Sequence, residues 1–472
     1  MPEHEFAVWA PKPDVVRLDV EGTLHPMERA EDGWWRAVVD ASPDARYGFV
    51  LDDNPKVLPD PRSPRQPEGV HERSQLWQPP ADVWSDADWK GRSIEGAVIY
   101  ELHIGTFTPD GTFDSAIDKL DYLVDLGVDF VEVMPVNAFG GTHGWGYDGV
   151  LWYAVHEPYG GPDADPLDRR VPPARPRGAD RRRLQPPGPV GKLPARVRPV
   201  PVLGLEPVGR VDQHRRRGAD QVRRYILDCA LRWMRDFHAD GLRLDAVHAL
   251  VDTTAIHILE EMSAETDSLA GELGRPLSLV AESDLNDPRL ITPRDQGGLG
   301  MTAQWDDDIH HAIHTAVSGE RQGYYSDFGT LEALAQTLRH GYFHAGTFSS
   351  FRQRRHGRPL DTATIPATRL LAYTLTHDQV GNRAIGDRPS QNLTTGQLAI
   401  KAALALGSPY TAMLFMGEEW ASSSPFQFFS SHPEPDLARA TAEGRKKEFA
   451  DHGWDATRYP IRRTPRHSSG RS

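Results

Sequence analysis

Residues 241–248, GLRLDAVH, form the stretch from which the fold is best read. The segment before them, opening at Asp220, repeats apolar residues at helical spacing: Val222, Ile226, Ala230, Trp233 and Phe237. Gly241 stops this helix, and residues 242–247 then read as a buried strand. A helix that runs straight into a buried strand predicts a parallel βα repeat.

The same alternation extends to both sides of this stretch. From about Gly96 we expect strands at 97–104, 128–134, 242–247, 277–281, 370–375 and 410–416. Helices are expected at 113–123, where Thr112 can cap the first turn, and at 398–406. Repeated βα units form either a closed barrel or an open doubly wound sheet. No glycine-rich phosphate loop follows the first strand, which favours a (β/α)8 TIM barrel.

The first eighty or so residues have a different pattern. Short strands are expected at 6–9, 16–20, 34–39 and 47–51, separated by Pro, Gly and Asp, which predicts a small β-sandwich. A proline-rich connector follows at 59–67. We therefore expect an N-terminal sandwich over 1–82, a catalytic α/β barrel over 83–440, and a remnant of a C-terminal region over 441–472.

The amino-acid composition indicates which kinds of ligand and which cellular compartment to expect. The formal charge of −14 and the scarcity of long lysine clusters argue against a nucleic-acid partner, because phosphate binding needs a basic face; neutral or weakly charged ligands fit better. Twelve tryptophans and thirteen tyrosines could stack on sugar rings, although most should lie in cores. The single cysteine, Cys229, cannot form an internal disulfide or a cysteine-rich metal site. No leader-like segment or apolar run of membrane length is present, so we expect a cytoplasmic protein without a membrane partner.

Three expected strands end in polar groups that a core would not tolerate. Arg243 and Asp245 lie two apart, so they share one face, and the arginine keeps the aspartate ionised. Glu282 ends an apolar strand, where partial desolvation suits a proton donor. His377 and Asp378 end a third strand. Singly, each could be a helix cap or a structural ion pair; together, two carboxylates about 5 Å apart, one ionised and one protonated, make the apparatus of a retaining glycosidase.

These motifs resemble three of the four short conserved regions of glycoside hydrolase family 13, the α-amylase superfamily, in order and spacing. The resemblance implies that Asp245 is the nucleophile, Glu282 the acid/base, and Asp378 the carboxylate that binds the distorted sugar. It also implies that Arg243 holds the nucleophile and that His377 binds sugar hydroxyls. The remaining residues that we expect to contact substrate are Tyr147, Trp145 and Asp148 in the segment GWGYD (144–148), and His248. In the family, the tyrosine stacks on the sugar.

Other segments are most similar to the family members that release trehalose from maltooligosyl trehalose. They include YELHIGTFTPDGTF (100–113), AESDLNDPR (281–289) and FMGEEWA (415–421). These members also carry an immunoglobulin-like N-terminal sandwich similar to a carbohydrate-binding module. The expected substrate is maltooligosyl trehalose or a related α-glucan. The alternatives are a branching or debranching enzyme and a catalytically impaired glucan-binding protein.

No organic cofactor and no metal are expected. His310 and His314 lie four apart after an acidic run, which could suggest a metal site. Any helix produces this spacing, however, and the resemblance gives a different explanation, a loop and helix that border the sugar cleft.

Residues 163–218 depart from the family. They are dominated by Arg, Pro and Gly, have no strand or helix period, and lack the strand Asp-Val-Val-x-Asn-His, whose histidine contacts the sugar. We hypothesise a shifted reading frame that is restored near Ala219, and the tail after Trp454 has the same character. The coding DNA, read in three frames, tests this. The expected consequence is a barrel that lacks one strand and exposes two unpaired edges.

Overall fold

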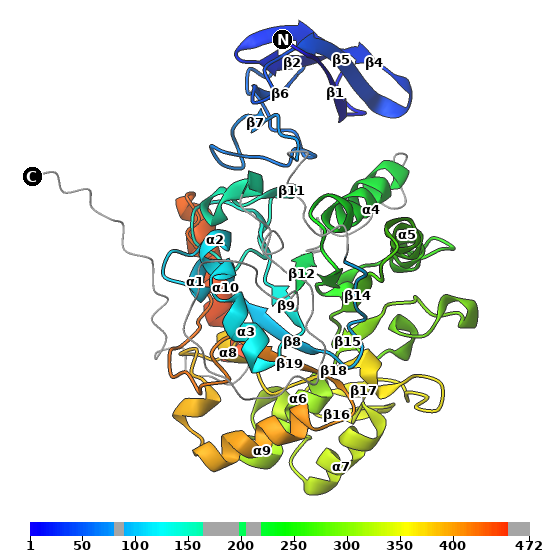
Figure 1. Ribbon diagram of the computed structural model, residues 1–472, viewed down its shortest axis with the longest axis vertical. Coiled ribbons are helices and arrows are strands. Elements are labelled where there is room, and N and C mark those ends of the chain that lie inside the picture. The colour runs from blue at the N-terminus through cyan, green and yellow to red at the C-terminus, as the bar shows by residue number, and fades with distance from the viewer. Residues whose placement is uncertain (80–88, 164–197, 204–218, 452–472) are drawn as a thin grey trace, which may run out of the picture.

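The computed structural model describes residues 1–79, 89–163, 198–203 and 219–451. In Figure 1 the N-terminal strands lie at the top and a closed barrel surrounded by helices lies beneath them. The protein is therefore an α/β barrel preceded by a β-sandwich, which confirms the predicted fold class.

The N-terminal part consists of two antiparallel sheets. One has the order β1 (Glu3–Trp9), β5 (Trp34–Asp40), β4 (Glu28–Arg29). The other has the order β3 (Thr23–Pro26), β2 (Val16–Val20), β6 (Arg46–Leu51), β7 (Ser74–Gln75). Alternating residues of both sheets, among them Phe6, Leu18, Trp35 and Phe49, form one buried core. The four strands expected here are all present.

Eight parallel strands close the barrel. In spatial order they are β8 (Val98–Leu102), β9 (Phe130–Val133), β12 (Arg198–Leu203), β13 (Gly241–Leu244), β14 (Ser278–Ala281), β15 (Ala303–Trp305), β18 (Leu370–Tyr373) and β19 (Thr411–Phe415). Five of them lie within strands read from the sequence, and a sixth, β13, overlaps the predicted 242–247 but begins one residue earlier, at Gly241. The strand β15 was not predicted, because three residues are too short to show a period.

The prediction that the barrel lacks a strand is wrong. Residues 198–203 form β12, which pairs with β9 through four residues and with β13 through two. Strand pairing uses backbone groups, so a sequence without strand periodicity can still fill the gap. Pro199 and Pro201 provide no backbone N–H. Residues two apart in a strand direct their backbone groups to the same adjacent strand, so both missing donors face one side. The N–H groups of the intervening residues remain available to the strand on the other side. Most of the segment 163–218, and with it the reading-frame hypothesis, lies outside the described residues.

Helices cover the outside of the barrel. They are α1 (Ile104–Phe107), α2 (Phe113–Ile117), α3 (Leu120–Leu126), α4 (Ala219–Asp236), α5 (Ile258–Leu273), α6 (Asp307–Ser318), α7 (Leu331–His340), α8 (His377–Gly381), α9 (Thr395–Leu406) and α10 (Pro435–Asp451). Two short hairpins, β10 (Asn137–Ala138) with β11 (Leu151–Val155) and β16 (Thr347–Ser349) with β17 (Arg354–His356), extend from the loops. Thr112 caps α2 as predicted, but the expected helix 113–123 divides into α2 and α3. None of the described helices is long and apolar enough to cross a membrane.

The alternation of side chains along each barrel strand decides which residues face the helices and which face the inside of the barrel. Leu242 and Leu244 are fully buried in the large core, which also includes helix residues such as Leu227 and Trp233. Arg243, between them, points to the other face of β13 and is also fully buried. The strands thus turn apolar residues outward to the helices and direct selected polar residues into the barrel, toward the ends of β13, β14 and β18.

Candidate active site

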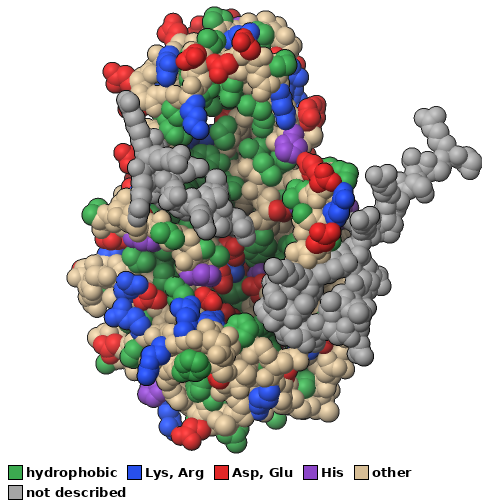
Figure 2. Space-filling model, turned by 180° about the vertical axis from the view of Figure 1, so that it is seen from behind, with side chains coloured by type: hydrophobic (Ala, Val, Ile, Leu, Met, Phe, Trp, Pro, Cys, Tyr) green, Lys and Arg blue, Asp and Glu red, His purple; other side chains and the backbone are tan. Residues whose placement is uncertain are grey.

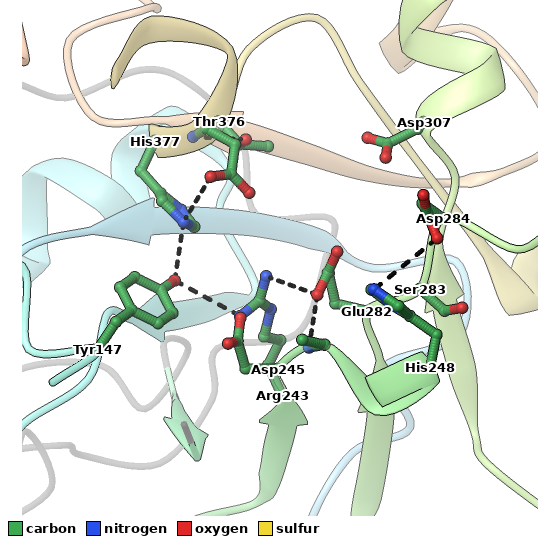
Figure 3. A network of polar contacts seen from close by, with 12 residues as sticks. Tyr147, Arg243, Asp245, His248, Glu282, Ser283, Asp284, Asp307, Thr376 and His377 are labelled. Atoms are coloured by element: carbon green, nitrogen blue, oxygen red, sulfur yellow. Dashed lines mark hydrogen bonds and ion pairs between the residues drawn. The ribbon is translucent and has the colours of Figure 1, made fainter. Parts of the chain in front are cut away.

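Arg243 connects the residues that follow two neighbouring strands. Its guanidinium forms an ion pair with Asp245, just after β13, and lies 3.7 Å from a carboxylate oxygen of Glu282, just after β14 (Figure 3). The same guanidinium lies over the ring of Trp305, with its central carbon 4.3 Å from the ring centroid. Because Arg243 is fully buried, the two carboxylates and this ring fix its position.

The backbone between these strands is bent tightly. Ala246 has φ 45° and ψ 42°, the left-handed region that non-glycine residues rarely adopt. In this conformation its N–H donates to the side chain of Glu282 at 2.6 Å. The Glu282 main chain also pairs with Leu244 and Val247, at 2.9 and 3.0 Å. The strained turn at Ala246 therefore orients the Glu282 carboxyl group.

Burial gives Glu282 the properties of a proton donor. Its side chain is 17% exposed, and burial raises its pKa to about 8 from an ordinary 4.5. Arg243 opposes this rise, while the negative charges of Asp245, Asp378 and Asp307 add to it. At neutral pH Glu282 thus holds a proton, beside an aspartate that is paired with a buried arginine.

His377, which follows β18, contacts the same group of residues from a third strand. Its Nε2 hydrogen-bonds the Tyr147 hydroxyl at 2.8 Å and lies 3.5 Å from Asp378, and its Nδ1 pairs with Glu101. Burial lowers the pKa of His377, but Asp378 and Glu101 together raise it to about 9. Tyr147 also accepts a long hydrogen bond from Arg243, at 3.5 Å. Through Arg243, Tyr147 and His377, one polar network thus connects Asp245, Glu282 and Asp378; Figure 3 shows the part from Glu282 to His377.

The other three predicted residues lie around this network. Trp145 is 5% exposed, stacks on Phe426 and meets the edge of His377, so it packs behind the site. The side chain of Asp148 is 39% exposed and lies 3.5 Å from Nδ1 of His432. His248 lies 3.9 Å from Asp284, on the Glu282 side in Figure 3.

Several residues of the site were not found from the sequence. Glu101 on β8 is fully buried and accepts hydrogen bonds from the backbone and side chain of His377. A lone acid within an apolar strand was the available signal. Asp307, at the start of α6, accepts a hydrogen bond from Tyr373 at 2.7 Å, and burial raises its pKa to about 6. The sequence interpretation placed its acidic run in a loop and helix that border the sugar cleft, but did not single out Asp307 itself.

The histidines of α6 have partners other than a metal. His310 hydrogen-bonds Tyr325 at 3.0 Å, and His314 hydrogen-bonds Glu320 at 2.8 Å. Within the described part of the chain, no group of three or more His, Cys, Asp or Glu residues could hold a metal ion. Figure 2, the face opposite to that of Figure 1, shows acidic and histidine side chains on the floor of a hollow bordered by hydrophobic ones.

Comparison with known proteins decides the family. No family model matches the chain. A malto-oligosyltrehalose trehalohydrolase from Mycobacterium tuberculosis is 67% identical over 470 residues, which cover 98% of this chain and 80% of the relative. The chain belongs to the malto-oligosyltrehalose trehalohydrolase family. Trehalohydrolases from Arthrobacter ramosus (55% identical) and Saccharolobus solfataricus (39%) cover 98% and 94% of this chain, and it spans 81% and 78% of them.

Solved structures agree with this family. A candidate alpha amylase from Salmonella typhimurium has a TM-score of 0.82 and 36% identity over 97% of this chain and 78% of its own. A Bacillus subtilis pullulanase complexed with maltose has a TM-score of 0.60 over 96% of this chain and 70% of its own, at 16% identity. The second likeness is one of fold alone. The trehalohydrolase family is thus built on the same barrel as other α-amylase enzymes.

Proposed function

We propose that this chain hydrolyses the α-1,4-glucosidic bond next to the terminal trehalose unit of maltooligosyl trehalose and releases trehalose with retention of configuration. It is a glycoside hydrolase of the α-amylase family, and its relatives are named for this reaction. The observation that carries the proposal is the state of two neighbouring carboxyl groups. Asp245 is paired with the buried Arg243, whereas Glu282 is held protonated beside it.

The mechanism that these residues support is a double displacement. Glu282 donates its proton to the glucosidic oxygen, trehalose leaves, and an Asp245 carboxylate oxygen bonds the anomeric carbon. The ionised Glu282 then takes a proton from water, whose oxygen attacks the same carbon and releases Asp245. Two inversions give net retention. Arg243 remains paired with whichever carboxylate is charged, which limits the cost of charge in a buried site.

The other side chains of the network are proposed to bind the sugar at the cleavage point. Asp378 is 38% exposed and lies beside a cationic His377, so it can accept hydrogen bonds from sugar hydroxyls. Tyr147 offers its ring for stacking, with its hydroxyl held by His377. For Trp145 a supporting contact is proposed instead of a direct one, and Asp148 and His248 are proposed to contact sugars at the rim.

Trehalose release from purified protein tests the proposal. Maltooligosyl trehalose is the substrate, branched glucan is the comparison, and Asp245→Asn is the inactive control. The proposal would be supported if proton NMR detected two products, trehalose and a maltooligosaccharide that retains the anomeric configuration. New α-1,6 bonds or debranched chains would support the branching or debranching alternative instead. Glucan binding without turnover would leave only the impaired glucan-binding protein.

We also propose the domain limits and the compartment. The proposed limits are 1–82 for a carbohydrate-binding-module-like domain, 83–440 for the barrel and 441–472 for a remnant of a C-terminal region. Separate buried cores support the division between the first two, whereas α10 (Pro435–Asp451) runs across the limit at 440. Limited proteolysis that cuts near residue 82 would test the first limit.

A cytoplasmic location is supported by the single buried cysteine, and fractionation of cells would test it.

A further inference from the structure

A row of buried charged side chains extends from α9 toward the turn that carries His377 and Asp378. Lys401 on α9 is only 2% exposed. Its Nζ donates to the carbonyl oxygen of Thr374 at 3.3 Å and contacts Nδ1 of His314 at 3.1 Å. An ammonium group can only donate, so Nδ1 is the acceptor and the other nitrogen of His314 carries the hydrogen.

That tautomer lets the row continue through His314. Its Nε2–H donates to Glu320 at 2.8 Å, and Glu320 pairs with Arg383 at 3.0 Å. Arg383 in turn pairs with Asp387, also at 3.0 Å. Charges of opposite sign thus alternate along the row, which offsets the cost of burying the Lys401 ammonium. Of the two histidines that first suggested a metal, His314 is part of this row, whereas His310 hydrogen-bonds Tyr325.

At its other end the row reaches the catalytic turn. Thr374 follows β18 and stands three residues before His377. Its carbonyl is held by Lys401, and its hydroxyl donates to Glu418, whose second oxygen accepts from the backbone N–H of Phe415 at 3.2 Å. The turn is therefore held from the helix side at Thr374, while Glu101 holds His377 from inside the barrel.

We propose that Lys401 is a positioning residue, which fixes the Thr374 carbonyl from α9 and thereby places His377 and Asp378 in the sugar cleft. The inference rests on the proposed function for the roles of those two residues. It assigns to α9 a task beyond packing against α6. That packing has its own polar contact, because Gln397, one turn earlier on α9, donates to the carbonyl oxygen of Val317 on α6 at 3.1 Å.

Gln397 provides the matched control for a Lys401 variant. Lys401→Met removes the ammonium and keeps a long, unbranched side chain. Lys401, Thr374 and Glu418 line a cavity of about 510 Å³, so the methionine has room to adjust. Gln397→Met breaks a polar contact of the same helix that does not reach the turn. Lys401→Gln, one atom shorter and still polar, serves if the methionine variant does not fold.

The first measurement is trehalose release. We expect Lys401→Met to lower kcat roughly 10- to 100-fold, the effect of a small misplacement of catalytic groups, with a smaller change in KM. Gln397→Met should lower the unfolding midpoint and leave kcat unchanged. In an Asp378→Asn background the Lys401 effect should largely disappear, since both changes act through one group. Equal kcat values for the two single variants, or an undiminished effect in that background, would overturn the proposal.

The second measurement does not depend on turnover. The Nδ1–H of His377, bonded to Glu101, should give a low-field proton resonance, assigned by its absence in His377→Gln. We expect this resonance to shift in Lys401→Met or Lys401→Gln and to stay in place in Gln397→Met. An unmoved resonance would refute the positioning role. Absence of trehalose from the wild-type protein, with the shift still present, would instead refute the proposed function alone.

Discussion

Glu282→Gln should make the protein more stable as it makes it inactive, and the gain should depend on pH. The glutamine keeps the shape of the side chain and can still accept the hydrogen bond from the N–H of Ala246. It cannot ionise. Any difference in stability that varies with pH therefore reports the cost of holding Glu282 protonated in the fold.

The magnitude follows from the raised pKa. Burial raises the pKa of Glu282 to about 8 in the folded protein, against an ordinary 4.5. At pH 7 the folded protein holds this proton and the unfolded chain has lost it, so folding must take up a proton. The wild type thus loses stability as pH rises from 4.5 to 8. Each pH unit is worth about 1.4 kcal/mol, so the loss at pH 7 is about 3 kcal/mol.

Thermal unfolding between pH 4 and pH 8.5 measures this effect. Below pH 4.5 the wild type and Glu282→Gln should unfold at nearly the same temperature. At pH 7 the variant should unfold roughly 6 °C higher, at about 2 °C for each kcal/mol in a large domain. Glu272→Gln, an exposed change on α5, should leave the midpoint unchanged at every pH. A gap that stays constant with pH, or a lower midpoint for Glu282→Gln at pH 7, would refute the reasoning.

Three further predictions concern the buried charges of the barrel. Asp307→Asn removes one negative charge that raises the pKa of Glu282, so the alkaline limb of kcat/KM, near pH 8 in the wild type, should move to lower pH; an unmoved limb would contradict this. Arg243→Met leaves the carboxylate of Asp245 without its buried cation and should destabilise the protein by about 3–5 kcal/mol in denaturant titration, whereas a loss under about 1 kcal/mol would argue against the pairing. Glu132 is fully buried, and apart from the side chain of Trp305 neither of its oxygens has a hydrogen-bond partner among the described residues; burial raises its pKa to about 8. Glu132→Met should therefore raise stability by about 1–3 kcal/mol, and a lower unfolding midpoint would show that the carboxyl group has a favourable contact.

The sequence predicted the elements whose patterns are long and regular. The segment that opens at Asp220 became α4, and the strands around Asp245 and Glu282 became β13 and β14. It did not predict β15, which has three residues, or the break between α2 and α3. Periodicity needs several repeats to be visible, and tertiary contacts set the limits of short elements.

Residues at strand ends could be found because the fold itself selects them. A polar residue that follows an apolar strand of a parallel barrel lies at the functional face, which is how Asp245, Glu282 and Asp378 were singled out. Glu101 and Lys401 were missed for a physical reason. Both are buried and act through contacts with residues more than twenty positions away, which no local pattern records.

The strand β12 supplies the backbone pairing that the barrel needs at this position, but not the side chain that the family has there. Residues 198–203 lack the family pattern, yet their backbone closes the barrel between β9 and β13. Because β13 is then paired on both sides, Arg243 and Asp245 keep a fixed position next to β14 and Glu282. The histidine that the family resemblance implies, in contrast, would bind sugar through its side chain, which the backbone of another sequence cannot replace. One absent hydrogen bond to substrate costs about 1 kcal/mol, or up to 3 kcal/mol with a charged partner. The carboxyl groups on the other strands are unaffected, so the loss should slow trehalose release without abolishing it.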